Sequence, residues 1–139
     1  MSRVFWDTNL FIYLTEDYPE HGAKVAALRR RMLERGDTLY TSALTLGEVL
    51  VLPIRAGNAD LRVRYESALA SVAVIPFDRE AAAVFAAVRA AGGVRAPDAI
   101  QLACASVART DLLITNDERL SQQRVAGIQF ITSLDRAPL

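Results

Sequence analysis

Histidine, cysteine and lysine are almost missing from this sequence. Its 139 residues contain one of each, His21, Cys104 and Lys24. A single cysteine cannot form an internal disulfide, and Cys104 stands in an alanine-rich helical pattern that is typical of a buried, inert thiol. A single histidine excludes RNA cleavage by a pair of histidines, and the shortage of both residue types removes the ligands of a zinc site.

Net charge and long apolar runs are also lacking. The 16 Lys and Arg residues balance 16 Asp and Glu residues, so no overall field attracts a polyanion. Asp7 interrupts the apolar N-terminal run, which argues against a signal peptide, and no stretch approaches the roughly 18 apolar residues of a membrane span. We therefore expect a cytoplasmic protein with no membrane partner and, at 52% hydrophobic residues, a single domain over residues 1–139.

Arginine supplies all but one of the 16 basic residues, and several arginines are grouped. One group contains Arg29, Arg30, Arg31 and Arg35, and the other contains Arg55, Arg62 and Arg64. Arginine suits bidentate phosphate contacts, so either group is a possible RNA contact. Solvated helix faces produce the same pattern, and the sequence leaves both interpretations open.

Short apolar runs alternate with helical patterns along the whole chain. Strands are expected at Arg3–Trp6, Leu39–Thr41, Val72–Phe77, Leu112–Thr115 and Ile128–Thr132. Helices are expected at Thr8–Thr15, Gly22–Glu34, Asn58–Ser71, Glu80–Ala91, Pro97–Arg109 and Asp117–Gln123, with a further helix that Ser42 caps and that Pro53 and Gly57 break or kink. This alternation predicts an α/β fold with a parallel, doubly wound sheet.

Four acidic residues stand where a strand ends or near the start of a helix. They are Asp7, Glu48, Asp98 and Asp117. Ligands of such sheets bind beyond the carboxyl ends of the strands, so we expect these four together there, and Asp37 and Asp111, which precede strands, at the opposite end. Two carboxylates about 4 Å apart repel by roughly 4 kcal/mol at an effective dielectric constant of about 20. A pocket of this kind predicts a divalent cation.

Each acid taken alone also has a purely structural explanation. Asp7 and Asp117 can cap helices, and Asp98 gains from the helix dipole in a first turn. Glu48 can be an exposed helix residue. Asp78 also follows a strand and precedes a helix, and we expect it to be only a cap.

Small polar neighbours favour the joint interpretation. Thr8–Asn9 directly follow Asp7. Thr115–Asn116 directly precede Asp117 in the same style. Such side chains can hydrogen-bond a carboxylate or a metal-bound water, so the strand ends carry a shared polar rim.

Four segments carry a family pattern. They are Asp7-Thr8-Asn9, Ser42–Glu48, Pro97-Asp98-Ala99 with Ala103 beyond it, and Leu113–Asp117. Together, in this order and over the whole chain, they resemble the PIN-domain nucleases. The resemblance implies an α/β, PIN-like three-layer fold with a central five-stranded, mostly parallel sheet flanked by helices. Small single-domain members are mostly the VapC-type toxins of bacterial VapBC toxin–antitoxin pairs.

The resemblance also implies a metal-dependent endoribonuclease that hydrolyses RNA phosphodiester bonds. Its matching acidic positions are Asp7, Glu48, Asp98 and Asp117. We expect Asp7 and Asp98 to ligate Mg²⁺ or Mn²⁺ directly, because these hard cations prefer carboxylate oxygens. Glu48 and Asp117 would hold metal-bound waters, a second metal or the attacking water. Asn9 and Thr115 would hydrogen-bond these ligands.

The partners follow from the same resemblance. They would be an RNA substrate, a VapB-like antitoxin that inserts an arginine into the acidic pocket, and a second copy of this chain in a homodimer. The alternative is a non-catalytic PIN-like scaffold that binds RNA or protein. The presence of all four acids argues against that alternative, because an abandoned metal site tolerates their loss.

Overall fold

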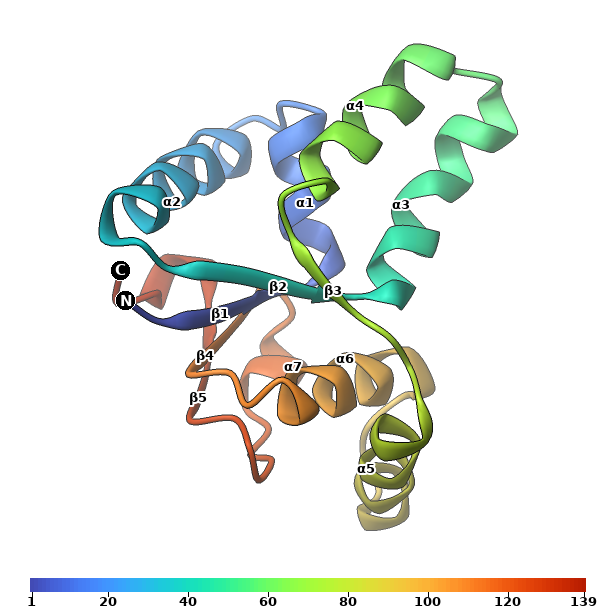
Figure 1. Ribbon diagram of the computed structural model, residues 1–139, viewed down its shortest axis with the longest axis vertical. Helices are drawn as coiled ribbons and strands as arrows, with labels where there is room; N and C mark the ends of the chain where they lie inside the picture. The colour runs from blue at the N-terminus through green and yellow to red at the C-terminus, as the bar shows by residue number, and fades with distance from the viewer.

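The structure, a computed structural model, describes all of residues 1–139 as alternating strands and helices (Figure 1). The strands are β1 (Arg3–Trp6), β2 (Thr38–Ser42), β3 (Ala73–Ile75), β4 (Leu112–Thr115) and β5 (Phe130–Ser133). The helices are α1 (Thr8–Thr15), α2 (His21–Arg35), α3 (Ala43–Ala56), α4 (Ala59–Leu69), α5 (Arg79–Ala91), α6 (Ala96–Val107) and α7 (Glu118–Ser121), followed by the 3₁₀ helix Leu134–Arg136. No helix combines the length and the apolar sequence needed to cross a bilayer.

The five strands form one sheet in the order β3-β2-β1-β4-β5. Every neighbouring pair is parallel, and Val4 in β1 pairs with Leu39 on one side and Leu112 on the other. The chain builds outward from β1 to β3 and then returns to place β4 and β5 beyond β1. The strand order therefore reverses between β1 and β4, which is where ligands bind in sheets of this kind.

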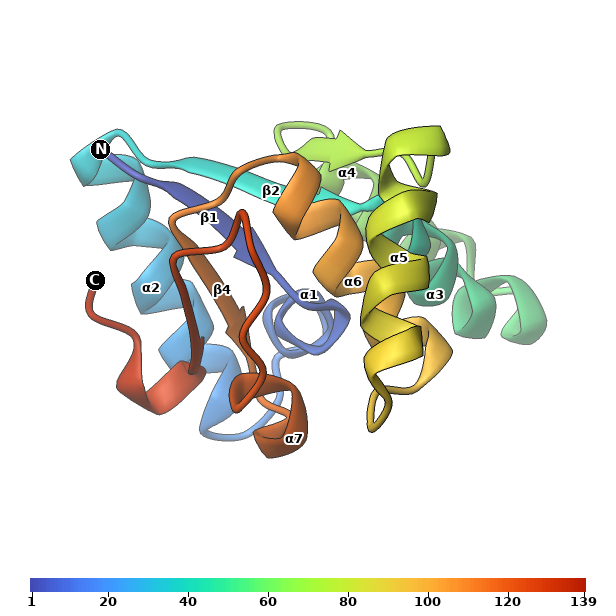
Figure 2. The ribbon, with the colours of Figure 1, turned by 90° about the horizontal axis from the view of Figure 1, so that it is seen from below.

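Helices cover both faces of the sheet, giving the expected three layers (Figure 1). Because successive strand residues point to opposite faces, Val4 and Trp6 pack into a core with α1–α4, whereas Phe5 packs into a second core with α5–α7. In β4, Leu113 joins the second core. Helices α5 and α6 lie side by side over that face (Figure 2).

Backbone chemistry explains where the elements end. Of the two residues expected to break or kink α3, Pro53 does not end it; the helix runs through this buried proline to Ala56 and ends at Gly57, whose φ of 63° is left-handed. Inside a helix, a proline removes one hydrogen bond and its ring crowds the carbonyl four residues earlier, so Pro53 weakens this turn without ending it. Strand β3 is shorter than expected, because Pro76 has no N–H to donate to a ladder.

The amino ends of the strands carry acids of a purely structural kind. Asp37 accepts a hydrogen bond from the backbone nitrogen of Ser2 at 2.6 Å, and Asp111 accepts one from that of Arg3 at 2.8 Å. Both carboxylates therefore anchor the start of β1. They lie at the opposite end of the sheet from the residues that follow β1 and β4, as expected.

Candidate active site at the carboxyl end of the sheet

One open hollow of about 330 Å³ at the carboxyl end of the sheet brings the four predicted acids together. Asp7 directly follows β1, Glu48 stands in the second turn of α3, Asp98 opens α6 and Asp117 follows β4. Four segments far apart in the chain thus contribute one carboxylate each. Asp78 follows β3 but does not line this hollow; its Oδ1 instead accepts from the backbone nitrogen of Ala81 at 3.0 Å and caps α5.

Asp7 is the buried member of the group, with only 9% of its surface exposed. Its Oδ1 accepts hydrogen bonds from the backbone nitrogen of Thr8 at 2.8 Å and from Gln101 Nε2 at 3.0 Å, and its Oδ2 accepts one from Thr115 Oγ1 at 2.7 Å. Burial raises the pKa of Asp7, these three hydrogen bonds oppose that rise, and the charge of Asp98 adds to it. The ionised form of Asp7 therefore lacks a compensating positive charge.

Gln101 lies at the centre of a buried hydrogen-bond network that the sequence did not reveal. It is 2% exposed, and its Nε2 lies 3.0 Å from Asp7 Oδ1, 3.1 Å from Thr8 Oγ1 and 2.9 Å from Thr45 Oγ1. Its Oε1 accepts from Ser42 Oγ. The signal that could have found it is its spacing, because residue i+3 after Asp98 shares a helix face with that acid.

The same network reaches Glu48, whose own side chain is exposed. Thr8 Oγ1 donates to Glu48 Oε1 at 2.7 Å and lies 3.0 Å from Thr45 Oγ1. Since the single hydroxyl proton of Thr8 goes to Glu48, Thr45 is the donor in the second contact. The side chains around Gln101 thereby orient two of the four carboxylates.

Thr115 and Asn9, the two predicted supporting residues, differ in their contacts. Thr115 Oγ1 donates to Asp7 and accepts from the backbone nitrogen of Asp117 at 3.0 Å, which joins the ends of β1 and β4. Asn9 lines the hollow but hydrogen-bonds none of the four acids, and its Oδ1 is buried without a partner. Asp117 also caps α7, because its Oδ1 accepts from the backbone nitrogen of Arg119 at 2.9 Å.

Arg95 is a second residue that the sequence did not reveal. Its Nη2 lies 3.2 Å from Asp98 Oδ2 and 3.7 Å from Asp117 Oδ2, so one guanidinium pairs with two of the acids. Its side chain is 64% exposed, whereas that of Asp98 is 20% exposed. A charged group thus stands at the open side of the hollow and can leave it without unpacking any core.

The side chains fit a hard divalent cation by their chemistry but are not gathered into a finished ligand set. No three Asp, Glu, His or Cys side chains lie close enough to share one ion as they stand. The four acids nevertheless supply only oxygen donors to one hollow, which is the donor type that Mg²⁺ and Mn²⁺ prefer. Movement of Arg95 away from Asp98 and Asp117 would leave room for such an ion.

Solved structures of toxin–antitoxin complexes have a similar fold. A chain of VapBC2 from Rickettsia felis, bound to a promoter DNA fragment, gives a TM-score of 0.75 at 14% identity, over 94% of this chain and 97% of that one. A toxin–antitoxin complex from Klebsiella pneumoniae gives 0.67 at 24% identity, over 90% and 94%. VapBC-5 from Mycobacterium tuberculosis gives 0.63 at 21% identity, over 95% and 99%.

A sequence profile of the PIN domain matches residues 4–127. No curated protein sequence matches the chain. The matched region contains β2, β3, β4 and all but the first residue of β1, together with the four acids, Gln101 and Arg95. The chain therefore belongs to the PIN domain family.

Proposed function

We propose that this protein is a Mg²⁺- or Mn²⁺-dependent endoribonuclease and the toxin of a toxin–antitoxin pair. The observation that carries the proposal is the convergence of Asp7, Glu48, Asp98 and Asp117 on one hollow at the point where the strand order reverses. The burial of Asp7 adds to this, because a desolvated carboxylate without a counter-charge favours a bound cation. Membership of the PIN domain family and the similarity to VapBC complexes support the toxin assignment.

Within this proposal, the residues of the hollow have distinct roles. Asp7 and Asp98 would hold the cation directly, with Glu48 and Asp117 beside it, and the bound cation would supply activation of water and neutralisation of charge on the phosphodiester. Gln101 and Thr115 each donate a hydrogen bond to the carboxylate of Asp7, and these bonds fix its orientation at the hollow.

Two further side chains prepare the open side of the hollow. Thr8 fixes Glu48 through a hydrogen bond of 2.7 Å. Arg95 neutralises Asp98 and Asp117 until a cation takes its place, and the released guanidinium can then contact a phosphate. The protein thereby presents a defined set of oxygen donors without a permanent ligand geometry.

Asp7→Asn should lower the rate of total RNA cleavage in Mg²⁺ by on the order of 100-fold or more. Loss of a residue that only hydrogen-bonds a metal ligand already lowers metal affinity or activity about 10- to 100-fold. RNA binding should remain largely intact. The measurement is gel analysis of RNA incubated with purified protein, with and without Mg²⁺ or Mn²⁺.

The matched control is Asp78→Asn, which makes the same substitution at a strand end outside the hollow. Asn caps helices as well as Asp does, so this variant should keep its stability and its activity. Equal cleavage by both variants would sink the catalytic assignment. RNA binding by the wild type without cleavage in either metal would favour the non-catalytic scaffold.

Asp7→Asn should also raise the free energy of unfolding near neutral pH without divalent ions. Burial raises the folded-state pKa of Asp7, so its stabilising contribution is present below the unfolded pKa of about 3.9 and is lost as pH rises through the folded pKa. Urea unfolding should therefore give the variant a larger free energy of unfolding than the wild type at about pH 7, and this difference should shrink toward about pH 4.

Mg²⁺ should make the wild type more stable than the Asp7→Asn variant. A cation that binds only the native state stabilises the wild type by about 2.7 kcal/mol at 100 times its Kd, and the variant much less. A stability difference between variant and wild type that stays the same from about pH 4 to about pH 7 would contradict the view of Asp7 as an uncompensated buried charge, because hydrogen bonds lost to the Asn amide shift stability equally at every pH.

The proposed partner is a VapB-like antitoxin whose arginine enters the acidic hollow. The contacts of Arg95, at 3.2 and 3.7 Å from two acids, support the idea that a guanidinium can be accommodated there. Expression of this chain alone should arrest bacterial growth, and co-expression of the protein encoded beside it should restore growth. Changing the inserted arginine to alanine should weaken inhibition by about 2 to 5 kcal/mol, measured as a change in Kd.

Harmless expression of an active enzyme, together with no binding by a neighbouring gene product, would refute the toxin assignment but not the nuclease. The expected homodimer stays a prediction. The exposed apolar side chains of Val51, Leu52 and Ile54 on α3 provide a surface on which a second copy can pack.

A further inference from the structure

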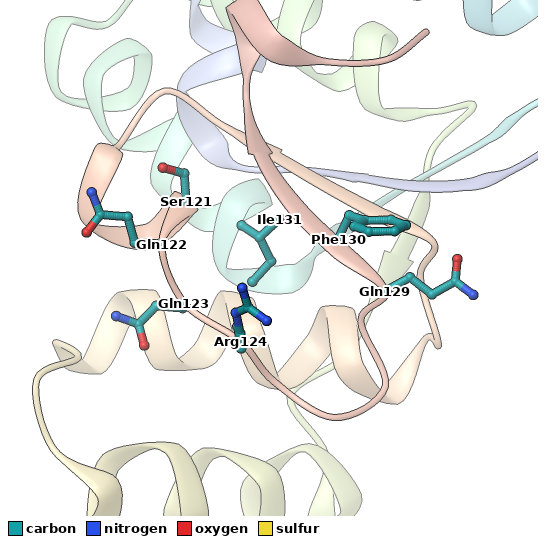
Figure 3. A pocket seen from close by; sticks show the side chains of 7 residues that line it. All are labelled: Ser121, Gln122, Gln123, Arg124, Gln129, Phe130 and Ile131. Atoms are coloured by element: carbon teal, nitrogen blue, oxygen red, sulfur yellow. The ribbon is translucent and has the colours of Figure 1, made fainter.

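A groove of about 500 Å³ lies between the segment that follows α7 and the edge strand β5 (Figure 3). Gln122 and Gln123 stand on one side of it and Gln129 and Phe130 on the other, with Arg124 between them in this view. None of its lining residues is acidic. The groove therefore combines three amides, one cation and one aromatic ring without a negative charge.

A third, smaller hollow shares lining residues with both this groove and the acidic hollow. This smaller hollow is lined by Gln123 of the groove and by Arg119, Arg95 and Asp98. Arg95 and Asp98 also line the hollow that holds the four acids. A polymer that lies in the groove and passes Gln123 and Arg95 would reach the proposed catalytic carboxylates.

Three arginines line this route, of which Arg95 is paired with Asp98 and Asp117. Two other acids, Glu118 and Asp135, line a separate hollow that shares Ser121, Gln122 and Ile131 with the groove. Arg124, Arg119 and Arg95 follow one another, and Asp98 is the only acid that lines either the groove or the smaller hollow. Arg119 and Arg124 form no salt bridge, so their guanidinium groups are free for phosphate. Because the net charge of the chain is zero, attraction of RNA has to come from such a local group.

The segment that joins the two sides of the groove is anchored to α6 and to the residues that follow it. Ser106 Oγ donates to the carbonyl oxygen of Ala126 at 2.6 Å, and the backbone nitrogen of Gln129 donates to the carbonyl oxygen of Thr110 at 3.2 Å. At Gly127, where φ is 92°, a Cβ would come within 2.7 Å of Ser106 Oγ, so only glycine allows this close approach. A groove shaped before binding loses little entropy when it takes a ligand.

Phe130 is 68% exposed on the edge strand, beside amides that can donate and accept. Exposed aromatic rings stack on unpaired bases, and glutamine amides hydrogen-bond base edges. Resting on the proposed nuclease function, we propose that this groove binds single-stranded RNA and leads it to the acids. Phe130 stacks on a base of the RNA, and Arg124 and Arg119 contact phosphates of the RNA backbone.

The test measures RNA binding rather than cleavage. A fluorescently labelled, mixed-sequence RNA single strand is titrated with full-length protein in EDTA, and its anisotropy gives Kd. Phe130→Ala should weaken binding about ten-fold, because one stacked base is lost. Arg124→Ala should weaken binding and flatten the slope of log K against log salt by about 0.7, because one phosphate contact is lost.

Two variants on the opposite layer are matched controls. Arg30→Ala removes an exposed arginine of α2, and Leu33→Ala removes a side chain that is 62% exposed. Both should bind like the wild type, and melting curves should show all four variants folded.

Loss of binding in the two groove variants alone supports the proposal, even if the wild type cleaves no RNA in Mg²⁺. In that case the nuclease proposal fails and the RNA site survives. The proposal is overturned if the groove variants bind RNA like the wild type, or if the wild type binds no RNA. It is equally overturned if duplex RNA binds as tightly as the single strand. The same holds if the groove variants lose binding to a protein partner while their RNA binding is unchanged.

Discussion

The buried amide of Gln101 is the contact on which the arrangement of the acids depends. Gln101 belongs to α6, and its Nε2 is within 3.1 Å of Asp7 after β1, Thr8 of α1 and Thr45 of α3. The two N–H groups of this nitrogen therefore have three acceptors within reach. An unpaired amide at this depth costs about 1 to 3 kcal/mol, so these elements are held where both N–H groups find a partner. The position of Asp7, and through Thr8 that of Glu48, follows from this requirement.

Charge balance is the second constraint on the site. Burial disfavours the ionised form of Asp7, whereas Asp98 and Asp117 share the guanidinium of Arg95. The hollow therefore has a compensated outer side and an uncompensated inner side. This asymmetry is consistent with the proposed binding of a small cation at Asp7 and of a guanidinium at the mouth of the hollow.

The sequence predicted the fold and the four acids because both follow from local rules. Alternating strand and helix patterns imply a parallel sheet, and residues at the carboxyl ends of parallel strands meet at one edge. Gln101 and Arg95 escaped notice because each gains its meaning only from partners on other elements; Gln101 and Asp7 are 94 residues apart in the chain. Of the two expected helix breakers, Gly57 ends α3, whereas Pro53 lies buried inside it.

The two arginine groups in the sequence do not lie at the acidic hollow or at the groove beside β5. Arg29, Arg30, Arg31 and Arg35 lie on α2, and none of them or of Arg55, Arg62 and Arg64 lines the acidic hollow or the β5 groove. Grouping along the chain did not predict which arginines converge, because Arg95, Arg119 and Arg124 come from separate segments. Only the packing of α6, α7 and β5 brings them onto one route.

Anomalous diffraction from crystals grown in Mn²⁺ would show whether these carboxylates hold a divalent cation. We expect an anomalous peak inside the hollow, at about 2.0 to 2.2 Å from oxygens of Asp7 and Asp98, with Arg95 no longer paired to Asp98. Absence of a peak there at saturating Mn²⁺, with Arg95 still bridging Asp98 and Asp117, would contradict cation binding by these residues.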